Sequence, residues 1–156
     1  QHVAPLFATP RTVKRFVNTY RLLRVSLPTS AFVALEGSDD VPGEYRAALL
    51  LLAVVAGQPN LAPPILRIVR EWGHENPDGR GANLLDVLDD PGDSAPVETR
   101  AWKRLRDQLR RVDRTWRAET GEPFVVHDGR TLASWAQRVS RYSFSVHAGG
   151  GASTIK

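Results

Sequence analysis

Hydrophobic residues recur at helical spacing along most of the chain, and this pattern predicts a mostly α-helical protein. The first predicted helix begins near Pro10, because Thr9 can cap it and proline suits the first turn of a helix. It ends before Pro28. Its apolar positions follow steps of three and four residues, and we expect them to form a stripe that faces the core: Val13, Phe16, Val17, Tyr20 and Leu23.

The second predicted helix, residues 44–56, is apolar on nearly every side, and we therefore place it at the centre of the fold. It contains the longest apolar run of the chain, residues 47–56. That run has about half of the roughly 20 residues that a membrane-spanning helix needs. A buried core helix is the better interpretation.

The rest of the chain predicts further helices, each with one apolar face. The fifth helix covers residues 97–119, and Asp128 or Thr131 can cap the last one. We expect a compact bundle of five to six helices over residues 1–143, a short strand or extended turn from Phe124 to Val126, and a flexible tail at 144–156. The apolar positions are Ile65, Ile68, Val69 and Trp72 in the third helix, Leu84, Leu85, Val87 and Leu88 in the fourth, Trp102, Leu105, Leu109, Val112 and Trp116 in the fifth, and Leu132, Trp135, Ala136, Val139 and Tyr142 in the last.

Composition narrows the classes of site that the chain can contain. The absence of cysteine excludes disulfide bonds, thiolate nucleophiles and cysteine metal sites. The chain has no methionine and starts at Gln1, so we interpret it as a segment of a longer polypeptide. Its start does not resemble a signal peptide, and we expect a cytoplasmic protein. The net charge is +4 with arginine far more frequent than lysine, which indicates either phosphate or nucleic-acid recognition or a GC-rich genome.

The sequence contains no complete active site. A phosphate-binding loop requires glycines followed by Lys and then Ser or Thr, and none of the three lysines follows a glycine. The histidines are too far apart to form a helical metal pair: His2, His74, His127 and His147. We therefore expect no catalysis, no metal site and no cofactor in this segment alone.

The basic segment near the N-terminus is similar to part of a known family. It reads Thr9-Pro10-Arg11, then Lys14-Arg15-Phe16-Val17-Asn18, then Tyr20-Arg21-Leu22-Leu23. This order resembles the C-terminal helical region of KAP-family P-loop ATPases, which are relatives of the AAA+ and STAND ATPases. The segment from Trp135 to Val146 is similar to the closing helix of that family.

The resemblance implies a non-catalytic helical lid over a nucleotide that is held by an upstream ATPase domain of the same polypeptide. ATP and Mg²⁺ would bind to that upstream domain. Arg11 matches the residue that senses the γ-phosphate, with Lys14 and Arg15 as supporting residues. Such a lid couples the nucleotide state to a partner protein, and bacterial members of the family are linked to phage defence or to membrane-associated assemblies. The alternative is that these cations only solvate the outer face of the helix.

Two other functions stay open at this point. A nucleic-acid-binding module is indicated by the cations of the fifth helix, although Asp107 and Arg111, and likewise Asp113 and Arg117, are spaced to form ion pairs that need no ligand. A protein-interaction module would use Trp102 and Trp116 as interface anchors rather than as core residues. The candidate nucleic-acid-binding residues are Arg100, Lys103, Arg104, Arg110, Arg111, Arg114 and Arg117.

Overall fold

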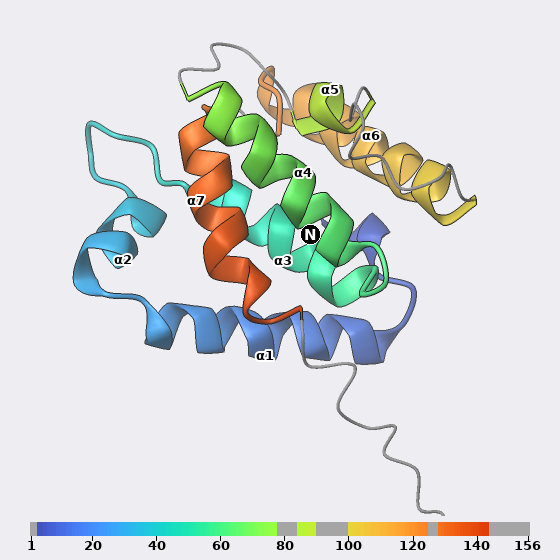
Figure 1. The fold of residues 1–156 in the computed structure, drawn as a ribbon, viewed down its shortest axis with the longest axis horizontal. Helices are drawn as coiled ribbons and strands as arrows, with labels where there is room; N and C mark the ends of the chain where they lie inside the picture. Colours follow the sequence, from blue (N-terminus) through green and yellow to red (C-terminus); the bar gives the residue numbers. More distant parts are fainter. Residues whose placement is uncertain (1–2, 78–83, 90–99, 125–127, 144–156) are drawn as a thin grey trace, which may run out of the picture.

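The computed structural model describes residues 3–77, 84–89, 100–124 and 128–143. Within these ranges the chain is a helical bundle without a β-strand, as the sequence predicts (Figure 1). The elements are a short 3-10 helix η1 (Ala4–Leu6) and the α-helices α1 (Pro10–Ser26), α2 (Thr29–Glu36), α3 (Tyr45–Gly57), α4 (Ala62–Glu75), α5 (Leu84–Asp89), α6 (Arg100–Thr120) and α7 (Gly129–Ser140).

Helix α3 lies at the centre of the bundle, which confirms the placement predicted from its sequence. Every residue from Leu50 to Ala56 is buried, because α3 has neighbours on most of its sides. Helices α1 and α7 pack against it, and Figure 1 shows α1 running along one side of the bundle. The side chain of Glu44, which precedes α3, accepts a hydrogen bond from the indole nitrogen of Trp135 on α7.

Helices α4 and α7 form the most extensive helix pair of the fold and lie side by side in Figure 1. Two glycines permit this close approach. A methyl group at Gly73 would overlap the carbonyl oxygen of Gly129, and one at Gly129 would overlap that of Asn76. Asp128 caps α7 by accepting a hydrogen bond from the backbone of Thr131 at 2.7 Å. Of the two residues predicted as possible caps, Asp128 is therefore the one that caps the helix.

Helix α6 lies at the edge of the bundle, where it contacts η1 and α5 (Figure 1). Its apolar stripe faces inward, and the side chains of Trp102, Leu105, Leu109 and Val112 are at most 2% exposed. The predicted start at residues 97–99 lies outside the described residues. Long charged side chains cover the rest of the helix, so α6 is anchored by one face only.

The structure corrects the sequence analysis at two places on this side of the fold. Helix α2 was not predicted, because Pro28 and the turn-forming loop after Glu36 leave only eight residues for it. The stripe of α1 is narrower than predicted: Phe16 and Tyr20 pack against the core, but Val13 is 42% exposed and Val17 37%. Val17 is about 100° from Phe16 around the helix, and this rotation places it at the edge of the contact.

Two predicted segments near the C-terminus lie partly or wholly outside the described residues. Phe124 is buried in a bend of the chain, and the remainder of the predicted extended segment, residues 125–126, lies outside the described residues. The predicted tail at 144–156 lies outside them as well. None of the described helices is both long and apolar enough to cross a membrane.

Candidate functional site

The first turn of α1 has the geometry that the sequence predicts for Arg11. Thr9 caps the helix by accepting a hydrogen bond from the backbone of Thr12 at 3.2 Å, and Pro10 is its first residue. Arg11 therefore lies in the first turn, and its side chain is exposed. Lys14 is exposed as well, whereas Arg15 is half-buried. The first turn contains no acidic residue.

The cations of α1 differ in whether the chain itself neutralises them. Arg24, in the last turn, donates a hydrogen bond to Glu36 of α2 at 2.7 Å. Glu36 is the first acidic residue of the sequence. Within the described residues, the side chains of the other four have no ion pair or hydrogen bond: Arg11, Lys14, Arg15 and Arg21.

Exposed aliphatic side chains lie among these cations. Leu22 is 61% exposed and Val25 87%, although neither belongs to the predicted stripe. Helical spacing places them on the same side of α1 as Arg11, Lys14 and Arg15. We call this mixed basic and apolar surface the α1 face, and it consists of Arg11, Lys14, Arg15, Leu22 and Val25.

Helix α6 uses part of its positive charge in ion pairs within the fold. Arg106 and Arg110 both contact Asp89 of α5, at 2.9 Å and 2.5 Å. Arg117 donates to Asp113 at 2.7 Å, as its spacing predicts. The other predicted pair is wrong, because Asp107 lies 3.9 Å from Arg110 rather than pairing with Arg111.

The nearly buried Asp113 also has a role that the sequence did not indicate. Its second carboxylate oxygen accepts a hydrogen bond from the backbone of Phe124 at 2.9 Å. The residue therefore ties the chain after α6 back onto the helix. The position of Asp113 beside the apolar stripe of α6 is the only signal in the sequence for this contact. The spacing of Asp113 and Arg117 already explained the acid as one half of an ion pair.

Five of the seven cations proposed for nucleic-acid binding have no ion pair within the described residues. They lie on the outer surface of α6, and we call them the α6 row: Arg100, Lys103, Arg104, Arg111 and Arg114. We exclude Arg110 and Arg117 from the α6 row, because they form ion pairs with Asp89 and Asp113.

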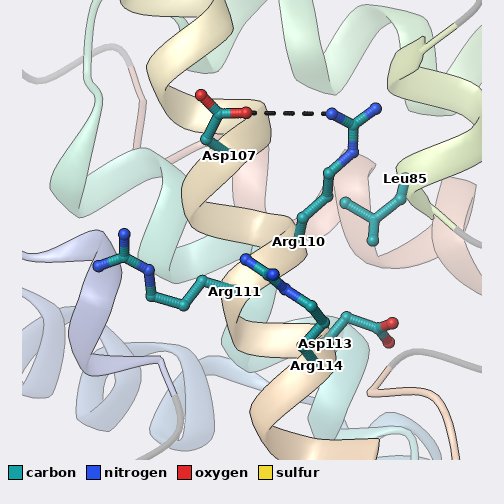
Figure 2. Close-up of a pocket in the computed structure, with 6 residues that line it drawn as sticks. All are labelled: Leu85, Asp107, Arg110, Arg111, Asp113 and Arg114. Atoms are coloured by element: carbon teal, nitrogen blue, oxygen red, sulfur yellow. Dashed lines mark ion pairs between the residues drawn. The ribbon is translucent and has the colours of Figure 1, made fainter.

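A depression of about 600 Å³ adjoins the α6 row (Figure 2). It is lined by Leu85, Asp107, Arg110, Arg111, Asp113 and Arg114. Figure 2 shows the guanidinium of Arg110 turned toward Asp107, while Arg111 extends away from that pair. The depression is therefore basic, with one of its carboxylates held by Arg110 and the other by Arg117.

The aromatic residues proposed as interface anchors pack within the fold. Trp102 is 2% exposed. Trp116 is half-buried, with the edge of the Phe124 ring against it and the guanidinium of Arg46 4.5 Å from its ring centre. Neither side chain is presented as an exposed anchor.

No group of His, Asp and Glu within the described ranges is arranged to hold a metal ion. His74 lines a smaller depression of about 270 Å³ between α4 and α7, together with Arg70 and Arg130. Among the described residues that line it, none carries a carboxylate. The depression is thus unsuited to a cation.

Comparison with known proteins identifies no family for this chain, but one stretch of it is similar to a group of known enzymes. No family model matches the chain, and no solved structure matches it. The chain is 29% identical over 98 residues to acetyl-coenzyme A synthetases of Mycobacterium tuberculosis and Mycobacterium bovis. The similar stretch is 60% of this chain, but the chain spans only 15% of the length of those enzymes.

Proposed function

We propose that this chain is the non-catalytic helical lid of a larger P-loop ATPase, in which it couples the nucleotide state to a partner protein. The nucleotide and its Mg²⁺ would lie in an upstream domain of the same polypeptide. The resemblance of both ends of the chain to KAP-family ATPases supports this proposal. The observation that carries it is the cluster of cations at the N-terminal end of α1, for which the described part of the chain offers no ion pair.

The arrangement of these cations is electrostatically unfavourable in the chain by itself. The N-terminus of a helix is the positive end of its dipole, so a cation there costs about 0.3–1 kcal/mol where an anion would gain as much. Arg11 is also three residues from Lys14 and four from Arg15, and like charges at these spacings cost about 0.2–0.5 kcal/mol per pair. A phosphate brought against this turn would attract both the helix dipole and the cations, and these attractions would offset both costs.

The three cations would act differently on a bound triphosphate. Arg11 is exposed in the first turn, and its guanidinium can hold two oxygens of a terminal phosphate at once. Lys14 offers a single mobile charge and would attract the phosphates without fixing their orientation. Arg15 is half-buried, so its reach outward is shorter.

The aliphatic part of the α1 face supports docking on a protein domain rather than on free nucleotide alone. Leu22 and Val25 are large apolar side chains that face solvent in the isolated chain. Burying each on a protein surface would contribute up to about 1.5–3 kcal/mol. In the proposed assembly, these residues rest on the ATPase domain and hold Arg11 over the nucleotide.

The experiment compares ATP hydrolysis by the complete polypeptide with that of three variants. We expect Arg11→Ala to lower kcat by at least about tenfold, as for the loss of a charged contact worth about 1.4 kcal/mol in the transition state. Lys14→Ala should have a smaller effect. Arg21→Ala is the matched control, because Arg21 is an exposed cation of α1 that lies ten residues, or about 15 Å along the helix, from Arg11.

Two results would overturn the proposal. The first is a complete polypeptide without a Gly-Lys-Ser or Gly-Lys-Thr loop. The second is equal hydrolysis rates for the wild type and the Arg11→Ala variant, which would make the cations of α1 a solvated surface.

A further inference from the structure

We infer that the α6 row is a binding surface for the phosphate backbone of double-stranded nucleic acid. The inference concerns α6 alone and does not depend on the proposed role of α1. It rests on three observations: the ion pairs that α6 makes, the fixed orientation of the helix, and the absence of exposed large apolar side chains from it.

The ion pairs separate two classes of cation on the same helix. Arg100–Thr120 contains eight cations and three acids. The cations nearest the core, Arg106, Arg110 and Arg117, bind Asp89 and Asp113. The five of the α6 row have no such contact, so no acid among the described residues neutralises their charge.

The buried stripe of α6 fixes the direction in which the row points. Trp102, Leu105 and Leu109 are almost completely buried, so the helix cannot turn about its axis without exposing them. By helical spacing the row occupies an arc of about 100° on the opposite side. From Arg100 to Arg114 it extends over about 21 Å at 1.5 Å per residue.

This length and charge match a nucleic-acid strand. Successive phosphates of one strand are about 3.4 Å apart along the duplex axis, so about six of them would face the row. Four of the five cations are arginines, which can bind phosphate oxygens in pairs. The other exposed residues on this side are Asp107, Thr115 and Ala118, and none has the amide side chain that reads an adenine.

The same surface is poorly suited to a membrane or a protein. Membrane-surface helices insert large apolar side chains, and protein interfaces centre on aromatic or aliphatic anchors. Within the described residues, no exposed large hydrophobic side chain belongs to α6, whereas four belong to α1. The phosphate backbone is thus the partner that the chemistry of the α6 row favours.

The test is fluorescence anisotropy of a labelled 30-base-pair DNA duplex with the chain of residues 1–156, over a series of salt concentrations. If all five cations contact phosphates, the logarithm of the binding constant should fall against that of salt with a slope near about −4.5, at about 0.9 per contact. A second duplex of different sequence should bind equally well. Weaker binding to the duplex than to phosphatidylserine vesicles would overturn the inference.

Two double variants test where the duplex binds, and a third variant is expected to strengthen binding rather than weaken it. Arg104→Gln/Arg111→Gln should reduce the slope by about 1.8 units, because two phosphate contacts are lost. Arg21→Gln/Arg70→Gln removes the same charge from exposed sites on α1 and α4 and should leave the slope unchanged. Asp107→Asn removes the acid within the row and should tighten binding. If both double variants reduced the slope equally, the duplex would be responding only to the net charge of the chain, and the inference would be overturned.

Discussion

Arg24 and Glu36 join α1 to α2 through a 2.7 Å contact between guanidinium and carboxylate. The same guanidinium lies 5.2 Å from the ring centre of Phe32 and 5.9 Å from that of Tyr20. Arg24 is therefore a structural cation, whereas Arg11, on the same helix, has no such contact within the described residues. This difference separates the charge that holds the fold from the charge available to a ligand.

Replacing these two arginines should affect stability differently. Arg24→Ala removes a partly exposed ion pair and ring contacts, so we expect the free energy of unfolding to fall by about 1 kcal/mol. Arg11→Ala should change it by less than about 0.5 kcal/mol, as expected at an exposed site. Urea denaturation of the chain measures both, and a larger loss for Arg11→Ala would mean that Arg11 has a structural partner.

The central position of α3 predicts a large effect at Leu51, whose side chain is fully buried. Leu51→Ala should lower the free energy of unfolding by about 2–5 kcal/mol, because it leaves a cavity. Leu22→Ala is the control, since Leu22 is 61% exposed, and it should cost less than about 0.5 kcal/mol. Similar costs for the two variants would be inconsistent with a central α3.

The sequence predicted the helical fold because the apolar periodicity was strong where burial was strong. This holds for α3, α4, α6 and α7, whose predicted apolar residues lie in the core or, like Trp72 and Trp116, pack against it. It failed for Val13 and Val17, because periodicity identifies a stripe but not how wide its contact is. The short helix α2 was not predicted, because eight residues are too few to show a clear helical periodicity of apolar positions.

The candidate sites were less predictable than the fold. The sequence indicated which helices were basic, and it placed Arg11 correctly in the first turn. It could not show which arginines were already bound, because the contacts of Arg106 and Arg110 with Asp89 cross between two helices. The helical spacing of Leu22 and Val25 already places them on the side of the cations, but only the structure shows that both side chains are exposed.

Two acids on α6 give a prediction about the segment that follows it. Asp113→Ala leaves the backbone N–H of Phe124 and the guanidinium of Arg117 without their acceptor. Because an unsatisfied buried polar group costs about 1–3 kcal/mol, we expect a loss of that size in urea denaturation. Asp107→Ala should cost less than about 0.5 kcal/mol, since Asp107 is exposed. Equal costs would contradict the role assigned to Asp113.

The chain by itself should not hydrolyse ATP. Phosphoryl transfer depends on positioning and on a metal ion, and the sequence has no phosphate-binding loop to provide them. The measurement is phosphate release by purified residues 1–156 in the presence of Mg²⁺, with an ATPase of known rate as the positive control. Turnover that increases in proportion to chain concentration through successive purification steps would contradict this expectation.

The most direct test of the proposed lid is the preference of the complete polypeptide for a triphosphate. The dissociation constants of a non-hydrolysable ATP analogue and of ADP are measured for the wild type and for Arg11→Ala. A γ-phosphate contact by Arg11 predicts that the wild type prefers the analogue and that the variant loses about tenfold or more of this preference, or about 1.4 kcal/mol. An unchanged ratio of the two constants in Arg11→Ala would contradict the account.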